Sequence, residues 1–262
     1  MPISRDPMPD LAMNRVPEVT VDFWLIKLMA VTMGETAADY LAVNLGLGLT
    51  MSSLIMAGFL IGALVLQFGQ KRYVPLSYWL AVVLISIVGT LVTDNLVDNF
   101  GVSLITTTTT IGFSVALAAT FAVWFASEKT LSIHAIFTTK REAYYWLAIL
   151  FTFALGTAAG DLVAEHFGLG YLSTGVLFGM IIASLTFGYF FLKLDPILGF
   201  WLAYILTRPL GASFGDLLSQ PAEYGGMGLG TIITSALFLS AIVAIVGYMS
   251  LKPKVRDEVA HG

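Results

Sequence analysis

One short pattern of residues occurs four times along this chain at a fixed spacing. Each copy begins with an aromatic residue, a tryptophan and a leucine, and carries a glycine ten residues after the tryptophan and an aspartate fifteen residues after it. The residues at these positions are Trp24, Trp79, Trp146 and Trp201, then Gly34, Gly89, Gly156 and Gly211, then Asp39, Asp94, Asp161 and Asp216. Chance does not produce this register, so we expect a fold built from four copies of one unit.

The composition indicates the environment in which these units fold. Of the 262 residues, 57% are hydrophobic and only 11% are charged, whereas a soluble globular chain carries about 25% charged residues. Mean hydropathy is +0.85. We therefore predict an all-α polytopic membrane protein. No cysteine is present, which excludes disulfides and thiolate chemistry. The 13 Lys and Arg residues form no long basic run, which argues against nucleic acid as a partner.

A hydrocarbon core of about 30 Å needs about 20 apolar residues per helix, and the chain offers eight such segments. The predicted spans are 22–43, 50–69, 76–98, 105–126, 143–165, 171–192, 197–218 and 229–250. Each repeat holds two spans, so all four copies enter the membrane in the same direction, as parallel repeats about an axis along the membrane normal. Short connections predict that each odd-numbered span packs against its successor as a hairpin.

Positive charges orient the spans, because cytoplasmic loops retain Lys and Arg. Eleven of the 13 fall before span one, after span eight, or in alternate loops, which predicts that both termini are cytoplasmic. The Trp-to-Trp steps of 55, 67 and 55 residues indicate a duplicated pair of repeats. The expected organisation is a disordered cytosolic arm at 1–20, membrane unit A at 21–128, a cytosolic linker at 129–142, membrane unit B at 143–251 and a cytosolic tail at 252–262.

The residues that carry the repeat also resemble a known family. Four tandem two-span repeats, each with a tryptophan and preceded by the lead-in Arg15–Thr20, are similar to a bacterial inner-membrane family described as a repeat of unknown function. The resemblance extends over roughly residues 20 to 251. It implies a multi-pass protein of the bacterial inner membrane, and it implies no activity.

The repeated aspartates are the candidate functional residues. A carboxylate inside a span costs about 2.5 to 3.5 kcal/mol on insertion scales, and such residues mark ion paths by default. Glu35 occurs only in the first repeat, four residues before Asp39 and on the same helical face. Carboxylates with threonine hydroxyls and carbonyls favour hard cations such as Mn²⁺, Mg²⁺ or a trivalent ion such as Al³⁺. Alternatively, each aspartate caps a broken helix or pairs with a base.

Only two bases, Lys27 and Arg208, lie inside the predicted spans, and Pro209 follows the second. Both bases are expected to gate the site or to act as counter-ions. Arg208 is expected to be either a tethered counter-ion that occupies the site without substrate or a static salt bridge to Glu35 or Asp39. The repeated glycines are expected to permit close helix packing or to open the helices. The repeated tryptophans are interpreted first as interfacial anchors and second as packing residues.

These features favour a secondary transporter, a proton-coupled exporter of a hard metal cation, over an enzyme. The expected partners are the lipid bilayer, the metal cation as substrate and protons, with no cofactor; the sequence does not define the oligomeric state. Three alternatives remain open: a cation channel with an acidic ring, an intramembrane enzyme acting on a lipid phosphate, and a purely structural subunit.

Overall fold

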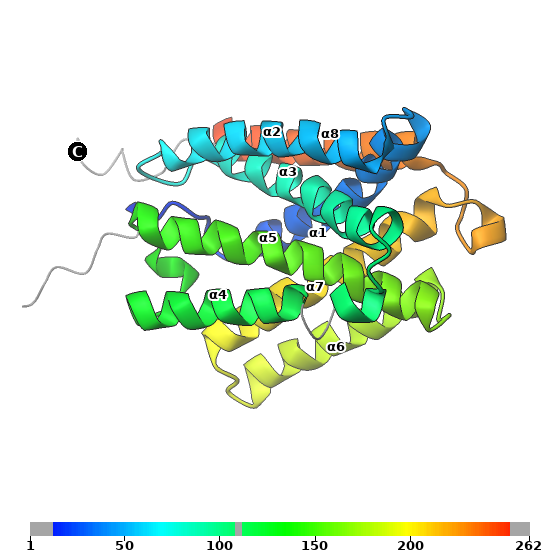
Figure 1. Cartoon of the computed structure of the whole chain (residues 1–262). Coiled ribbons are helices and arrows are strands. Elements are labelled where there is room, and N and C mark those ends of the chain that lie inside the picture. The colour runs from blue at the N-terminus through cyan, green and yellow to red at the C-terminus, as the bar shows by residue number, and fades with distance from the viewer. Residues whose placement is uncertain (1–12, 108–111, 252–262) are drawn as a thin grey trace, which may run out of the picture.

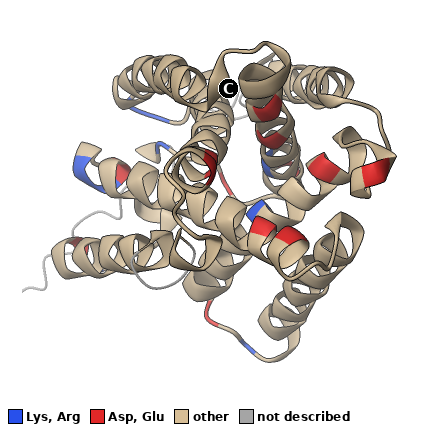
Figure 2. Cartoon of the chain, turned by 45° about the vertical axis from the view of Figure 1, so that its right-hand side comes forward, with Lys and Arg blue, Asp and Glu red and all other residues tan. Residues whose placement is uncertain are grey.

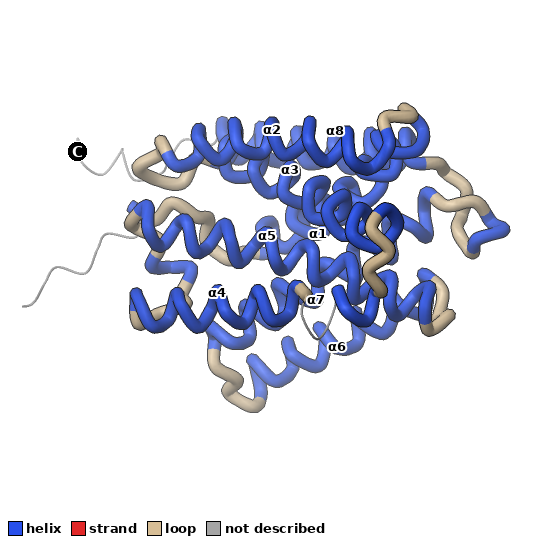
Figure 3. The backbone as a smooth tube through the Cα atoms, viewed as in Figure 1, coloured by secondary structure: helices blue, strands red, loops and turns tan. Residues whose placement is uncertain are grey.

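The computed structural model describes residues 13–107 and 112–251, and all regular structure in this part of the chain is helical (Figure 3). Its long helices pack side by side in one bundle, and successive helices run in opposite directions (Figure 1). They are α1 Val21–Asp39, α2 Gly48–Phe68, α3 Pro75–Asp94, α4 Phe113–Glu128, α5 Thr139–Asp161, α6 Tyr171–Phe191, α7 Pro196–Ser219 and α8 Thr231–Leu251. The prediction of an all-α protein is confirmed. The expected tail at 252–262 and the first twelve residues of the expected arm lie outside the described residues.

Local signals set the helix starts of the four repeats. The Thr20 and Thr138 hydroxyls accept hydrogen bonds from backbone N–H groups in the first turns of α1 and α5, and the Asp195 carboxylate does so in α7. Pro75 and Pro196 occupy first helical positions, where the missing N–H costs nothing. Each capping residue precedes its tryptophan by four to eight residues, so the repeated tryptophans all lie near the helix starts.

The first helices of the repeats form an inner ring, and the second helices lie outside it. α1 contacts α3 and α7, and α5 contacts the same two helices. Each outer helix packs on the inner helix of the following repeat, α2 on α3, α4 on α5 and α6 on α7, and α8 closes the ring on α1. The expected hairpin packing of each span on its own successor is therefore wrong. The repeats interlock instead, because each outer helix covers the next repeat.

The repeated glycines are the points where neighbouring inner helices touch. The residue ten positions after each tryptophan meets the residue seven positions after the tryptophan of the next repeat: Gly34 meets Ser86, Gly89 meets Phe153, Gly156 meets Arg208 and Gly211 meets Val31. A Cβ added at Gly89 would lie 2.9 Å from the Phe153 Cβ, and an added Cβ at the other three would collide outright. Glycine therefore allows the close helix approach that the sequence predicted.

Six of the helices are long and apolar enough to cross a membrane: α2, α6, α8, and α3, α5 and α7 of the inner ring. The outer helices expose most of their apolar side chains, as lipid contact requires. α1 carries four charged residues and α4 has only 16 residues, so neither meets the same criterion. The predicted span at 105–126 is interrupted: α4 begins at Phe113, and residues 108–111 lie outside the described part.

The loops that carry Lys and Arg all lie at one end of the bundle, together with the start of α1 and the end of α8 (Figure 1). We call this the basic end. The loops at the opposite end contain no Lys or Arg, and glycines with positive φ, such as Gly46, Gly101 and Gly168, turn the chain there. These three occupy equivalent positions, 22 residues after their tryptophans.

Part of the expected disordered arm is ordered, which corrects that prediction. The amide of Asn14 hydrogen-bonds to the Ile133 carbonyl at 3.0 Å, and its side-chain oxygen accepts from the Ile136 N–H at 3.1 Å. Arg15 Nη1 donates to the fully buried Glu142 carboxylate at 2.6 Å. Residues 13–16 therefore form a strap between the α2–α3 loop and the α4–α5 linker, because buried polar groups of both segments need these partners.

Candidate functional site

Four layers of buried residues close the middle of the inner ring, and their members recur at four-residue intervals that begin one residue before each tryptophan. Only Phe200 among them is more than slightly exposed. Counting outward from the basic end, the layers are Phe23, Tyr78, Tyr145 and Phe200; Lys27, Val82, Ile149 and Tyr204; Val31, Ser86, Phe153 and Arg208; and Glu35, Thr90, Thr157 and Ala212. The repeated aspartates form the fifth layer. Charge is therefore absent from the first layer and concentrated in the last two.

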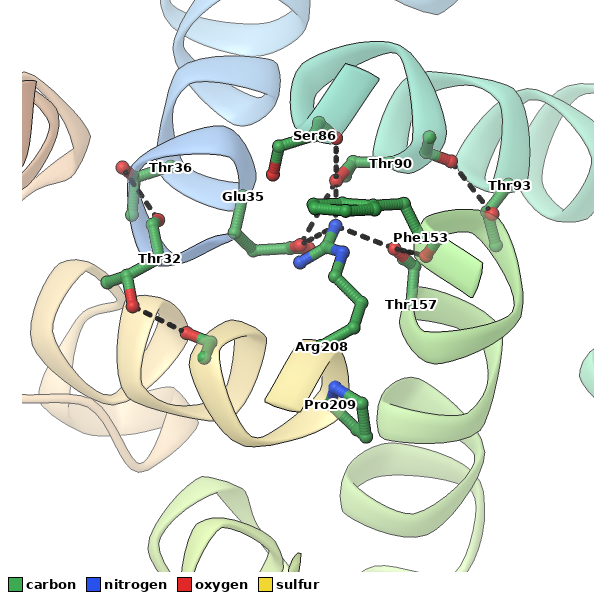
Figure 4. A network of polar contacts seen from close by, with 12 residues as sticks. Thr32, Glu35, Thr36, Ser86, Thr90, Thr93, Phe153, Thr157, Arg208 and Pro209 are labelled. Atoms are coloured by element: carbon green, nitrogen blue, oxygen red, sulfur yellow. Dashed lines mark hydrogen bonds and ion pairs between the residues drawn. The ribbon is translucent and has the colours of Figure 1, made fainter. Parts of the chain in front are cut away.

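Arg208 joins all four repeats at the centre of the ring (Figure 4). Its Nη2 donates to the Glu35 Oε2 at 2.7 Å, to the Thr157 Oγ1 at 2.7 Å and to the Thr90 Oγ1. Thr90 also donates to the Glu35 Oε2, at 3.1 Å. The guanidinium carbon lies 5.6 Å from the centre of the Phe153 ring. The predicted salt bridge between Arg208 and Glu35 is present and buried from solvent.

Three polar atoms beside this ion pair lack partners. Arg208 Nε and Nη1 and Ser86 Oγ are buried and have no hydrogen-bond partner among the described residues. Buried polar groups are otherwise paired in the great majority of cases. The polar layer therefore has hydrogen-bonding capacity left over for water or for a bound polar species.

Three carboxylates from three different repeats converge next to Arg208. Glu35, Asp161 and Asp216 can each present one oxygen so that all three oxygens lie within 4.8 Å of one another. Figure 2 shows Asp and Glu residues gathered around the middle of the bundle at the end opposite the basic end. We call these three residues the carboxylate triad. Its geometry is that of a small cation site with oxygen ligands.

The remaining two candidate acids stand beside the triad. Asp39 is half-buried and accepts a hydrogen bond from the Gln220 Nε2 at 3.1 Å. Asp94 is also half-buried. The helical spacing predicts that Glu35 and Asp39 act together, whereas the structure groups Glu35 with Asp161 and Asp216. Helical spacing reveals neighbours on one helix, and it does not reveal which residue of another helix is closer.

Each of the first three repeats changes its helix type directly after the aspartate. Five-residue π-helices follow Asp39, Asp94 and Asp161, at Tyr40–Asn44, Asn95–Asn99 and Leu162–His166. Such π segments are rare and occur mostly at functional sites. In the fourth repeat α7 continues past Asp216 to Ser219, but it contains Pro209, which removes one backbone hydrogen bond. All four inner helices are thus irregular next to the acidic layer.

Lys27 lies one layer further toward the basic end than Arg208. Its ammonium is fully buried and donates to the Tyr204 carbonyl at 2.7 Å and to the Thr207 Oγ1 at 2.6 Å. It also lies 3.8 Å from the centre of the Tyr204 ring. Lys27 forms no ion pair with any described carboxylate; its hydrogen-bond acceptors are neutral groups, and its ammonium faces aromatic rings.

The interpretation of the tryptophans as interfacial anchors is corrected for three of the four. Trp79, Trp146 and Trp201 are buried inside the bundle. Their indole N–H groups donate to the Tyr73 hydroxyl, the Glu142 carboxylate and the Leu131 carbonyl. Trp24 is only half-buried and packs on Phe23 and Phe200. The alternative reading, a packing role, fits these positions, because each indole needs an internal hydrogen-bond partner once it is buried.

The sequence interpretation counted threonine hydroxyls among the oxygen ligands but did not single out Thr90 and Thr157 as site residues, although a signal existed. Both lie eleven residues after their tryptophans, the same distance that separates Glu35 from Trp24. Aligning the repeats position by position would have placed all three in one layer. Glu142 lies in a polar linker, where a glutamate favours a salt-bridged surface helix, whereas the structure buries it completely. Its partner Arg15 is remote in sequence.

This combination of residues favours cation binding over other chemistry. Three carboxylates and two hydroxyls form a hard, all-oxygen ligand set. The layer holds no thiol and no imidazole, the ligands that softer metals prefer. Arg208 pairs with the Glu35 carboxylate of the triad, which leaves Asp161 and Asp216 to be neutralised by protons or by a bound cation. A cation that entered the triad would neutralise these two carboxylates and would compete with Arg208 for Glu35.

The structure thus defines a multi-pass membrane protein made of four interlocked repeats around a buried polar centre. The chain belongs to the family described as Repeat of Unknown Function (DUF347), whose model matches residues 23–73, 77–130, 144–194 and 199–253. The matches confirm the family resemblance inferred from the tryptophan register. No curated protein sequence and no solved structure matches the chain.

Proposed function

We propose that this protein is a secondary transporter of a hard metal cation, a proton-coupled exporter in the bacterial inner membrane with its basic end in the cytoplasm. The observation that carries the proposal is the carboxylate triad, in which Glu35, Asp161 and Asp216 can bring three oxygens within 4.8 Å of one another at the centre of the bundle. Each acid comes from a different repeat, so a cation bound there would join three inner helices.

The partnership of Arg208 with Glu35 supports a site that fills and empties. A buried charge without a partner is costly, so the carboxylate triad must be neutralised by protons or by a cation in every state. Arg208 supplies one positive charge while the site lacks substrate. An entering cation replaces the guanidinium as the partner of Glu35, and the guanidinium returns when the cation leaves. This exchange is the behaviour expected of a tethered counter-ion.

The packed middle of the inner ring supports a carrier over a permanently open channel. The first four layers are closed by packed side chains, including the contact of 2.5 Å between the Tyr78 and Tyr145 hydroxyls. Three of the four repeated aspartates are partly exposed at the other end. Closed layers on one side and partly exposed aspartates on the other fit a carrier that opens to one side at a time.

Metal binding by the purified protein tests this function. Titration with Mn²⁺ should raise the unfolding temperature of the protein in detergent, and calorimetry should give one bound ion. Glu35→Gln and Asp161→Asn should each weaken Mn²⁺ binding by about a hundredfold, the loss expected for a charged ligand. Glu223→Gln is the matched control, because Glu223 is an exposed acid at the same end. Equal binding by the wild type and both triad variants would refute the proposed site.

A genetic experiment identifies the substrate. Cells that lack the gene should become sensitive to one hard metal, and the wild-type gene should restore resistance while the Glu35→Gln gene should not. Mn²⁺, Mg²⁺ and Al³⁺ are the first metals to test. Unchanged sensitivity to every hard metal would contradict export.

A further inference from the structure

The basic end of the bundle contains a cavity that reaches one of the two buried bases. The cavity has a volume of about 850 Å³ and lies between α1, α6, α7 and the α4–α5 linker. Thr20, Ser132 and His134 line it near the basic end, and Thr207 lines it deeper inside. One water occupies about 30 Å³ of liquid, so the cavity has room for several water molecules, which its polar lining residues, Thr186 and Tyr189 among them, could hold within an otherwise largely apolar wall.

Thr207 connects this cavity to Lys27. Thr207 lines the cavity, and its hydroxyl accepts the hydrogen bond from the Lys27 Nζ at 2.6 Å. The second acceptor of Lys27 is the Tyr204 carbonyl, on the same helix. One residue, Thr207, therefore lies between the ammonium and the cavity, whereas the first layer of the ring separates the remaining layers from the basic end.

The surroundings of Lys27 hold no fixed negative charge. Arg208 on α7 is the charged group that acts on it, and it is also a cation. α5 contributes the Phe153 ring, 5.6 Å from the Nζ atom, and α7 contributes the Tyr204 ring. α3 and α8, the other helices packed on α1, form no ion pair with it among the described residues. The charge on Lys27 is thus balanced by nothing permanent.

We propose that Lys27 carries the proton that is exchanged for the transported cation, and that it releases this proton to the basic end through Thr207 and the cavity. The inference rests on the proposed function and names its coupling residue. In the release step one N–H bond of the ammonium breaks, the electron pair remains on Nζ, and the proton leaves on a water molecule in the cavity. The ammonium is restored when Nζ accepts a proton that enters from the opposite end through the acidic layer, so each cycle moves one proton across the protein.

Charge repulsion explains why the proton and the metal alternate. Lys27 lies eight residues before Glu35 on α1, so their Cα atoms are separated by about 12 Å along the helix. A metal ion in the triad adds positive charge next to Arg208 and within reach of Lys27. Binding of each cation therefore weakens binding of the other, and such coupling is reciprocal. An amine that can lose its proton serves this purpose, and a guanidinium cannot.

Purified protein in proteoliposomes that contain a pH-sensitive dye tests the proposal with Mn²⁺ as the probe. In the wild type, an Mn²⁺ gradient should drive protons in the opposite direction. Lys27→Met should retain Mn²⁺ binding at the triad and lose at least about tenfold of the Mn²⁺-driven proton movement, within the usual range of coupling. Lys71→Met, which makes the same change at an exposed lysine, should behave as the wild type does.

Thr207→Val provides a second variant should Lys27→Met fail to fold. It keeps the amine but removes the hydroxyl between Lys27 and the cavity, so proton movement should slow several-fold while Mn²⁺ affinity stays unchanged. Wild-type proton coupling in whichever of the two variants folds would overturn the assignment. If the wild type binds Mn²⁺ but moves no protons, the coupling inference fails and the metal site stands. If the wild type binds no metal, the proposed function itself fails.

Discussion

The ring has two opposite seams that share one geometry and differ in chemistry. At the α3–α5 seam, Gly89 packs on Phe153, and the Tyr78 and Tyr145 hydroxyls meet at 2.5 Å. At the α7–α1 seam, Gly211 packs on Val31 in the same way. The second seam also contains the buried Lys27, and the large cavity lies beside it. The repeat thus builds the same glycine contact at both of these seams, and of the two only the α7–α1 seam contains the buried Lys27 charge.

The strap increases this difference. Asn14 and Arg15 link the α2–α3 loop to the α4–α5 linker at the basic end, across the α3–α5 seam. The α7–α1 seam has an open cavity at the same end, and α7 contains Pro209 one position from Arg208. A helix without one backbone hydrogen bond bends more easily. We infer that the α3–α5 seam is the fixed half of the molecule and the α7–α1 seam the moving half.

The largest expected effect comes from Arg208, the base that faces the triad. Arg208→Met should lower the free energy of unfolding by about 3 to 5 kcal/mol, because it leaves Glu35 buried without its cation. Mn²⁺ should then stabilise the variant more than it stabilises the wild type, because no guanidinium competes for Glu35. Thermal unfolding in detergent with and without Mn²⁺ measures both effects.

The double variant Arg208→Met/Glu35→Gln separates charge from packing. Removing both charges should recover part of the lost stability and should abolish the response to Mn²⁺. If Arg208→Met unfolds at the wild-type temperature, the ion pair does not hold the moving seam together.

The strap should give the next largest effect, and on stability alone. Glu142 is fully buried and is bonded to Arg15 at 2.6 Å and to the Gln67 amide at 3.0 Å. Glu142→Gln should lower the free energy of unfolding by about 1.5 to 3 kcal/mol, the contribution of hydrogen bonds to a charged group. Calorimetric titration should show unchanged Mn²⁺ binding. A large change in Mn²⁺ affinity would place the strap within the transport machinery and would contradict a fixed half.

Matched glycine substitutions compare the two seams directly. Gly89→Ala and Gly211→Ala each add one Cβ to a tight helix contact, and such overpacking costs about 1 to 3 kcal/mol. Both should lower the unfolding temperature. Only Gly211→Ala should also slow Mn²⁺ transport in proteoliposomes, because only that seam is expected to move. Equal transport losses in the two variants would remove the distinction between the seams.

Much of this architecture could be predicted from sequence, since the tryptophan, glycine and aspartate register indicates four equivalent units whose inner helices all run in the same direction. The inner helix on which each outer helix packs could not be predicted, because the connecting loops are equally short whether α2 packs on α1 or on α3. The members of the site were predictable as Glu35, Arg208 and the aspartates. Their grouping was not, because it depends on which helices are neighbours in the ring, and the ordered strap depends on contacts more than 100 residues apart in sequence.

The smallest expected effect concerns an ion pair at the surface of the linker, which contrasts with the buried pair of the strap. Arg141 and Lys140 donate to the Glu128 carboxylate at 2.9 and 3.1 Å, and these hydrogen bonds lower the pKa of Glu128 below 4.5. A lowered folded-state pKa contributes stability above the ordinary pKa, and this contribution is lost as the pH falls through the lowered value. Glu128→Gln should therefore reduce the unfolding temperature slightly at pH 7 and leave it unchanged in strong acid, because exposed pairs contribute little. A loss at pH 7 as large as that of Glu142→Gln would show that the linker, and not the strap alone, fixes this half of the ring.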